Sequence, residues 1–234
     1  MEEYLKSTYY IDKDHPDIVE FAEKHTLKCT GMTDRAIALY YAVRDGIRYN
    51  PYTMEPDRAF IKASSTLKRG QGYCVAKAVL LAACARAVKI PARLGFADVK
   101  NHLNTAKLKE LMGTDVFIYH GYTELFLNGK WVKATPAFNL ELCSNFNVKP
   151  LEFDGTFDSI FHPFDNEGRR HMEYIRDHGN FADLPWDTIM KESMKLYPRY
   201  FENMERASHD FALEAVKEAG QDSAGSLPAQ ENRV

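Results

Sequence analysis

Cysteine is scarce in this chain, and the few cysteines form no recognisable motif. Only four of the 234 residues are cysteine, namely Cys29, Cys74, Cys84 and Cys143, and no two of them are spaced as C-x-x-C. A disulfide framework and a thiolate zinc site are therefore not expected, and the sequence favours four reduced thiols.

Long apolar runs and an excess of positive charge are also missing. No window is long and apolar enough to span a bilayer, and residues 1–6 lack the apolar segment of a secretory signal. The formal net charge is −3, and no block of like charge occurs. Nucleic acid and membranes are therefore not expected as partners, and we expect a cytoplasmic protein.

The residues that are present predict one medium domain with an extension. Hydrophobic residues make up 45% of the chain, which is enough to form a core. The segment from Tyr73 to about Val88 is apolar on nearly every face, as is typical of a buried central helix. Other helices are expected near Pro16 and over residues 33–46, 60–67 and 105–112, with a strand over residues 92–99. We predict an α+β domain whose helical N-terminal part packs, through the central helix, on an antiparallel sheet.

The later part of the sequence is less regular. A turn-rich, aromatic stretch follows Leu140, helical patterns return over residues 169–178 and from Trp186 to about Ala219, and residues 220–234 are polar. We predict a core over residues 1–150, a loop-rich and helical extension packed on it over 151–219, and a disordered tail over 220–234.

One cysteine stands where a nucleophile can be activated. The segment Gly70-Gln71-Gly72-Tyr73-Cys74 leads a glycine-rich loop into the predicted central helix. The N–H groups at a helix N-terminus favour a thiolate, and a histidine beside it can accept and return a proton. The sequence therefore predicts that Cys74 is a nucleophile, with His120 on a nearby strand as its general base and acid.

A hairpin places His120 relative to the residues that follow it. Asn128-Gly129 between two apolar runs predicts a two-residue turn that pairs Phe126 with Trp131 and Glu124 with Lys133. Extending this register puts His120 opposite Ala137, with Thr135 on the same face and Asn139 there too if the pairing continues so far, although Pro136 weakens the ladder. Thr135 or Asn139 is therefore expected to hold the imidazole, whereas Glu124 lies roughly 13 Å along the strand and is too distant.

Over residues 33–139 the chain resembles the transglutaminase-like superfamily of papain-type cysteine enzymes. Three blocks carry the resemblance in the same order: Gly70-Gln71-Gly72-Tyr73-Cys74 with Ala78 and Leu80-Leu81; Lys89-Ile90-Pro91-Ala92-Arg93; and His120 with Glu124 before Trp131-Val132-Lys133-Ala134-Thr135-Pro136. The resemblance implies a papain- or transglutaminase-like fold, with Cys74 as nucleophile and His120 as general base and acid.

The sequence departs from the family at the third member of the triad. The family places an aspartate before the proline that follows the tryptophan, whereas this chain has Thr135. A threonine hydroxyl can accept a hydrogen bond from the imidazole but carries no charge to stabilise an imidazolium. Either Asn139 supplies an amide partner, or the triad is weakened and the site is degenerate.

Two further groups of residues have weaker signals. Gln71 or Tyr73 could donate to an oxyanion together with the backbone N–H of Cys74. Late in the chain, the spacing of the acidic residues and histidines matches no compact metal-ligand motif, so a metal-dependent hydrolase is the least favoured hypothesis; these residues are His162, Asp165, His171, Glu173 and His178.

The sequence therefore predicts a cysteine-dependent hydrolase or acyltransferase that acts on a peptide or small amide. The reaction would pass through a thioester at Cys74 and need no cofactor. Hydrolysis and acyl transfer differ only in the last step, so the sequence does not separate them. The alternative is a catalytically degenerate, transglutaminase-like module that binds a peptide in the same cleft.

Overall fold

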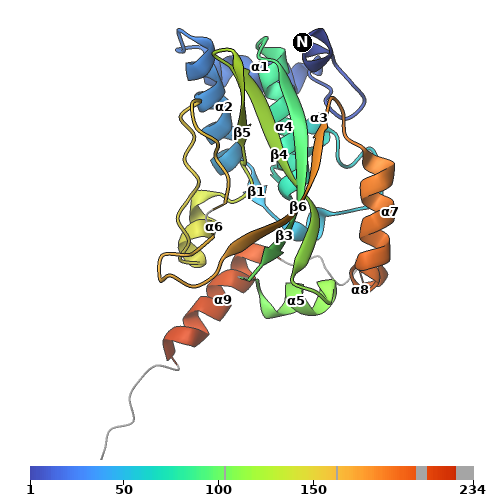
Figure 1. The fold of residues 1–234 in the computed structure, drawn as a ribbon, viewed down its shortest axis with the longest axis vertical. Helices are drawn as coiled ribbons and strands as arrows, with labels where there is room; N and C mark the ends of the chain where they lie inside the picture. The colour runs from blue at the N-terminus through green and yellow to red at the C-terminus, as the bar shows by residue number, and fades with distance from the viewer. Residues whose placement is uncertain (103, 162, 204–209, 225–234) are drawn as a thin grey trace, which may run out of the picture.

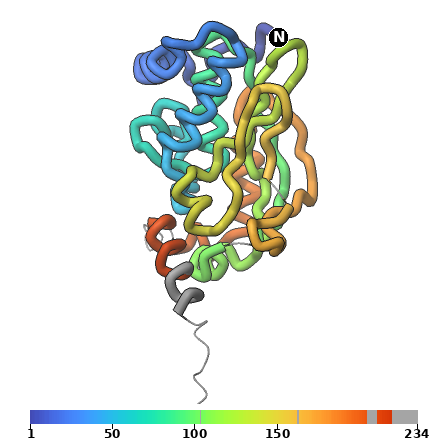
Figure 2. Tube along the Cα trace, turned by 90° about the vertical axis from the view of Figure 1, so that its left-hand side faces the viewer, coloured from blue at the N-terminus to red at the C-terminus, as the bar shows by residue number. Residues whose placement is uncertain are grey.

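A computed structural model describes residues 1–102, 104–161, 163–203 and 210–224. Figure 2 shows the N-terminal helices on one side of the molecule and the sheet on the other. The sheet contains β3 (Ala92–Asn101), β4 (Val116–Leu127), β5 (Lys130–Ala134) and β6 (Met172–Phe181) in the antiparallel order β5-β4-β3-β6. The α+β prediction, with a helical part packed on an antiparallel sheet, is confirmed (Figure 1).

The helical layer is built around α4 (Cys74–Ala87), which the sequence predicts as a buried central helix. Its side chains from Val75 to Arg86 are buried, and it contacts β4, α1 (Pro16–Thr26), α2 (Met32–Gly46) and α3 (Ala63–Arg69). Because the helix is apolar all round, it can be covered on every side without leaving polar groups unpaired. Lys77 and Arg86 are the exceptions. The Lys77 ammonium donates to the carbonyl oxygens of Arg44 (2.8 Å) and Ile47 (2.6 Å) at the end of α2, and the Arg86 guanidinium donates to the carbonyl oxygen of Ala92 (2.8 and 3.1 Å).

The hairpin register is confirmed. Leu127 pairs with Lys130, Phe126 with Trp131 and Glu124 with Lys133. Asn128 and Gly129 have φ values of +51° and +83°, and this left-handed backbone is the conformation that an Asn-Gly turn supplies at low cost. The turn residues therefore fix which side chains of β4 and β5 share a face.

Short elements connect the two layers near the start of α4. The parallel pair β1 (Arg48–Tyr49) and β2 (Gln71–Gly72) lies beside η2 (Pro51–Thr53), which Asn50 caps. The remaining short elements are η1 (Glu2–Leu5), α5 (Ala106–Met112) and α6 (Leu140–Asn145).

The C-terminal part differs from the prediction in two places. The helix expected over residues 169–178 is wrong, because Met172–Phe181 forms β6, which pairs with β3 along the edge of the sheet. The long helix expected from Trp186 is divided into α7 (Trp186–Leu196) and α8 (Pro198–Glu202), and α9 (Phe211–Ala224) follows. Pro198 stands at the break, because proline cannot continue the hydrogen bonding of a preceding helix.

The predicted disordered tail begins too early. Residues 220–224 belong to α9, and residues 225–234 lie outside the described part of the chain. Across the described residues, no helix combines the length and the apolar character needed to cross a membrane.

Candidate active site

Cys74 is the first residue of α4, as the glycine-rich approach predicts. Gly72 lies so close to the helix that a Cβ there would be 2.9 Å from the Cβ of Ala76 and 3.2 Å from the methyl group of Thr66. The absence of a side chain at Gly72 therefore lets the loop press against α3 and α4 and present Cys74 at the helix N-terminus.

His120 lies on β4 directly opposite this helix end. The next residue, Gly121, is so near α4 that a Cβ would be 2.9 Å from the Cα of Val75 and 3.3 Å from its backbone nitrogen. A larger residue would push the helix away from the strand. Gly121 therefore permits the close contact between β4 and α4, and this contact places Cys74 and His120 at the same pocket.

Cys74 and His120 line one small pocket of about 40 Å³. The other walls are mostly aromatic and aliphatic, and they come from β4, η2, α5, α7 and the segment around β1; they include Tyr49, Tyr73, Met112, Phe117, Ile189 and Tyr197. A site of this kind excludes water and strengthens electrostatic interactions within it.

Burial controls the protonation of both groups. Although part of its surface is exposed, the Cys74 thiol is enclosed by protein atoms, and this burial raises its pKa to about 11. The backbone N–H groups of Gly121, Val75 and Cys74 point to the sulfur and only partly oppose that rise. Burial also lowers the pKa of His120 to about 4. Burial thus favours the neutral form of both groups at pH 7, and it outweighs the preference for a thiolate that the N–H groups at the helix N-terminus supply.

Several buried polar atoms near this site have no hydrogen-bond partner among the described residues. They include His120 Nε2 and the hydroxyl oxygen of Tyr73, both on pocket-lining residues, and Oγ1 of Thr135 after the end of β5. Buried polar groups in folded proteins are nearly always paired, so unpaired ones indicate a place where something else is bound or where a proton moves.

The two predicted partners of the imidazole do not contact it through a hydrogen bond in this structure. Thr135 Oγ1 is unpartnered among the described residues, and the Asn139 side-chain oxygen accepts from the backbone N–H of Tyr49 at 3.1 Å. The reason is that the β4–β5 ladder ends at the Thr123–Ala134 pair, just before Pro136. The hairpin register therefore cannot be extended to Ala137, and His120 pairs with Ala97 of β3.

The two predicted oxyanion donors are separated. Tyr73 lines the pocket with Cys74, whereas Gln71 lines a different surface pocket. The side-chain oxygen of Gln71 accepts from Arg48 (3.1 Å) and Asn50 (3.2 Å) there. The structure thus brings together Cys74, His120 and Tyr73, and it does not bring Gln71 to them.

The late acidic and histidine residues do not gather. Among the described residues, no group of three or more His, Cys, Asp or Glu side chains could hold a metal ion. Asp165 pairs with Arg169 at 2.7 Å and His178 pairs with Asp98 at 2.6 Å, while His162 lies outside the described residues. All four cysteines are free.

Sequence reasoning noted that aromatic residues are frequent after Leu140 but did not predict which of them enclose the site. Phe161 packs on the His120 ring with centroids 5.1 Å apart. The Tyr197 hydroxyl accepts from the Ile118 N–H (2.7 Å) and donates to the Val116 carbonyl (3.0 Å). These residues belong to a part of the chain distant in sequence, and only the aromatic richness after Leu140 gave a signal.

Comparisons with known proteins identify the family of this chain. The sequence model of the transglutaminase-like superfamily matches residues 19–136, about half of the chain, which includes Cys74 and His120. No curated protein matches. A crystal structure from Cytophaga hutchinsonii, named a "Putative Cysteine Protease", is similar with 16% sequence identity and a TM-score of 0.45. The likeness covers 76% of this chain and 53% of that one, so this chain spans about half its length.

Proposed function

The chain belongs to the transglutaminase-like superfamily, and we propose that it is a cysteine-dependent enzyme that transfers the acyl group of an amide substrate to Cys74. One observation carries the proposal. The Cys74 thiol and the His120 imidazole line the same buried pocket, and the Nε2 atom of His120 has no hydrogen-bond partner among the described residues, so it is free to accept a proton.

The neutral states of the two groups determine the order of proton transfers. As the sulfur of Cys74 attacks the carbonyl carbon, its proton passes to His120, which acts as a general base. The oxyanion is stabilised by the backbone N–H of Cys74 and the unpartnered hydroxyl of Tyr73. The imidazolium then protonates the leaving amine, the C–N bond breaks, and a thioester remains on Cys74.

The thioester is resolved by water or by a second amine, and no cofactor takes part. Water gives hydrolysis of a peptide or small amide, and an amine gives acyl transfer. Both outcomes require the same acyl-enzyme. The first experiment therefore concerns the acyl-enzyme and leaves the choice of acceptor to later measurements.

An activated acetyl ester, p-nitrophenyl acetate, tests the proposal directly. The protein is incubated with the ester at pH 7, digested, and the acetylated cysteine is identified by mass spectrometry. We expect the acetyl group on Cys74, its loss in Cys74→Ala, and its retention in Cys143→Ala, whose thiol is also buried. Equal labelling of all accessible thiols, or labelling unchanged by Cys74→Ala, would contradict the proposal.

A second function is favoured by a different observation. Among the described residues, no carboxylate or amide is hydrogen-bonded to His120, so nothing stabilises its imidazolium. A degenerate module that binds a peptide in the cleft would need no such partner. Comparing the wild-type protein with Cys74→Ala separates the two functions. An enzyme turns over substrate, and Cys74→Ala abolishes turnover while binding remains; a binding module shows no turnover in either protein, and both bind the peptide equally.

A further inference from the structure

Three neighbouring strands are irregular at the same level of the sheet, next to His120. Between Ala97 and Val99 of β3, strand β4 contains one residue more than its partner, and Tyr119 there has a φ of +52°. Strand β6 also contains an extra residue, His178, opposite Phe96 and Ala97. A left-handed backbone is unfavourable for a bulky aromatic residue, so other contacts must hold Tyr119 in it.

A buried pair of side chains makes those contacts. One carboxylate oxygen of Asp98 accepts the backbone N–H of Tyr119 at 3.0 Å and lies 2.6 Å from Nε2 of His178. Because a carboxylate oxygen accepts, Nε2 of His178 carries the proton in this bond. The His178 ring also stacks on Tyr119, with centroids 4.0 Å apart and planes 19° apart.

The three residues are enclosed, so the arrangement is rigid. Asp98 and Tyr119 are buried, and only 7% of the His178 side chain is exposed. A bulge changes the direction in which the next side chain of a strand points. The next residue here is His120, whose ring lines the pocket of Cys74.

We propose that Asp98 and His178 are positioning residues that hold the Tyr119 bulge and thereby direct the His120 imidazole toward Cys74. This inference rests on the proposed acyl transfer between Cys74 and His120. Neither residue lines the pocket of Cys74, so they act through the backbone and ring of Tyr119. The carboxylate supplies the hydrogen bond that a regular β3–β4 pair would have supplied at this position.

Graded substitutions at Asp98 test the positioning role. Asp98→Ala removes the acceptor of the Tyr119 N–H, and we expect the rate of Cys74 acetylation at pH 7 to fall about 10- to 100-fold, because small displacements of a catalytic group are costly. Asp98→Asn keeps an acceptor oxygen and should restore most of the rate. Asp115→Asn removes a half-buried carboxylate just before β4, which pairs with Lys100 at 3.3 Å, and it serves as the matched control with an unchanged rate.

A second variant and a second readout keep the test decisive if Asp98→Ala fails to fold. His178→Phe keeps an aromatic ring on Tyr119 but removes the hydrogen bond to Asp98, and it should slow acetylation and shift the NMR signals of the His120 ring. A wild-type rate and unshifted His120 signals in folded Asp98→Ala or His178→Phe would overturn the inference. An absence of Cys74 acetylation in the wild-type protein would instead overturn the proposed function.

Discussion

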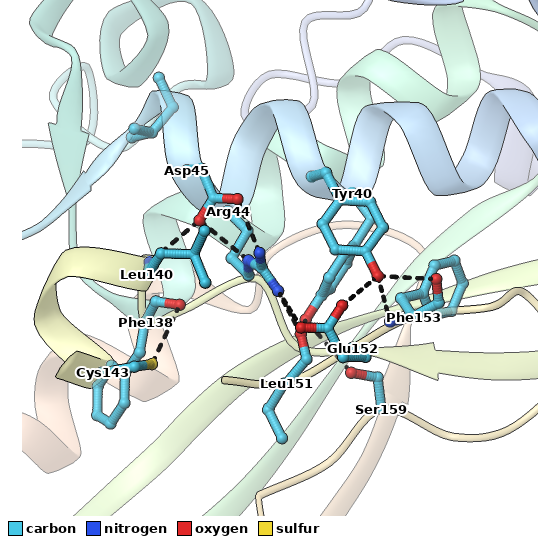
Figure 3. A network of polar contacts seen from close by, with 12 residues as sticks. Tyr40, Arg44, Asp45, Phe138, Leu140, Cys143, Leu151, Glu152, Phe153 and Ser159 are labelled. Carbon is cyan, nitrogen blue, oxygen red and sulfur yellow. Dashed lines mark hydrogen bonds and ion pairs between the residues drawn. The ribbon is translucent and has the colours of Figure 1, made fainter. Parts of the chain in front are cut away.

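Two buried polar regions of this molecule differ in how completely their polar atoms are paired. Figure 3 shows the first, in which Tyr40 and Arg44 of α2 bind Leu151, Glu152 and Ser159. The Tyr40 hydroxyl lies 2.9 Å from the Leu151 carbonyl oxygen, and Arg44 donates to Leu151 at 2.7 Å and to Asp45 at 2.8 and 3.0 Å. In the second region, the pocket of Cys74, His120 and Tyr73 each present a buried polar atom without a partner among the described residues.

This difference in the pairing of buried polar atoms indicates a structural role for the Arg44 network and a chemical role for the Cys74 pocket. A fully paired network fixes one arrangement of the chain and stabilises it. An unpaired buried atom costs stability and gains nothing in the resting state, so its presence indicates use in binding or proton transfer. The unpaired atoms of the Cys74 pocket therefore support the proposed reaction there, and the paired atoms of the Arg44 network indicate an anchor.

Each region also contains a cysteine, and the two thiols have similar acidity. Burial raises the pKa of Cys143 to about 11, as it does for Cys74. The Cys143 thiol faces the Phe138 carbonyl oxygen at 3.9 Å (Figure 3), whereas Cys74 shares its pocket with His120. A difference in their reactivity with acyl donors is therefore not expected from the thiol pKa. It is expected from the imidazole beside Cys74 and from the lower solvent exposure of Cys143.

The largest expected effect follows from removing that imidazole. His120→Gln should lower the rate of Cys74 acetylation at pH 7 by about 100-fold or more, because general base catalysis of this kind contributes about 10²- to 10⁴-fold. The Cys143 rate in the same sample is the internal control and should not change. Site-resolved mass spectrometry measures the acetylation rates of Cys74 and Cys143. An equal change in the two rates would contradict the claim that His120 acts on Cys74 alone.

A steric change at Gly121 should affect the pocket through the contact of α4 with β4. Gly121→Ala places a methyl group 2.9 Å from the Cα of Val75, and we expect a loss of about 1–3 kcal/mol in the free energy of unfolding together with slower acetylation. Gly46→Ala is the control, because a Cβ there has nothing within 4 Å, and the helix should be unchanged or more stable. Urea denaturation measures both variants, and equal stabilities would refute the close contact.

The unpaired imidazole should also make stability depend on pH. The pKa of His120 is about 4 in the folded protein and about 6.5 for an unperturbed histidine, so the unfolded chain binds more protons between these values. Stability is therefore lost as the pH falls below about 6.5, by about 2 kcal/mol between pH 7 and pH 5.

The matched variant isolates this contribution from other titrating groups. His120→Gln should lose less stability than the wild-type protein between pH 7 and pH 5, as measured by urea unfolding at each pH. Identical pH dependence in the two proteins would mean that His120 is not buried in its neutral form.

The smallest expected effect compares the same substitution in both regions. Tyr40→Phe removes a hydroxyl that lies within hydrogen-bond distance of three oxygens, and it should cost about 1 kcal/mol of unfolding free energy. Tyr73→Phe removes a hydroxyl without a partner among the described residues and should leave stability unchanged or raise it. Thermal unfolding measures both; a larger loss at Tyr73 would show that its hydroxyl is paired.

Local signals in the sequence predicted much of the fold. The Asn128-Gly129 turn determines the hairpin register, and the wholly apolar pattern identifies α4, because both depend on residues close in sequence. Strand β6 was missed because most of its residues are exposed and its pairing with β3 contains two bulges, so no period-2 pattern marks it. Pairing between segments this far apart cannot be determined from a local pattern.

The candidate site was also predictable only where it depends on local sequence signals. Glycines before Cys74 and the position of His120 predicted the two residues that share the pocket. The third member of a triad could not be predicted, because Pro136 ends the ladder and the chain after Ala134 no longer follows the strand register. Asp98 and His178 were not predicted as positioning residues because their relation to His120 passes through bulges in β4 and β6.

The pH dependence of Cys74 acetylation tests the central claim most directly. If neutral His120 deprotonates the thiol during attack, the wild-type rate should be nearly constant from pH 6 to pH 8, since the imidazole pKa is about 4 and the thiol pKa about 11. In His120→Gln only the thiolate reacts, so its rate should rise about tenfold per pH unit. A wild-type rate that also rises tenfold per pH unit would contradict the claim that Cys74 and His120 act as a pair.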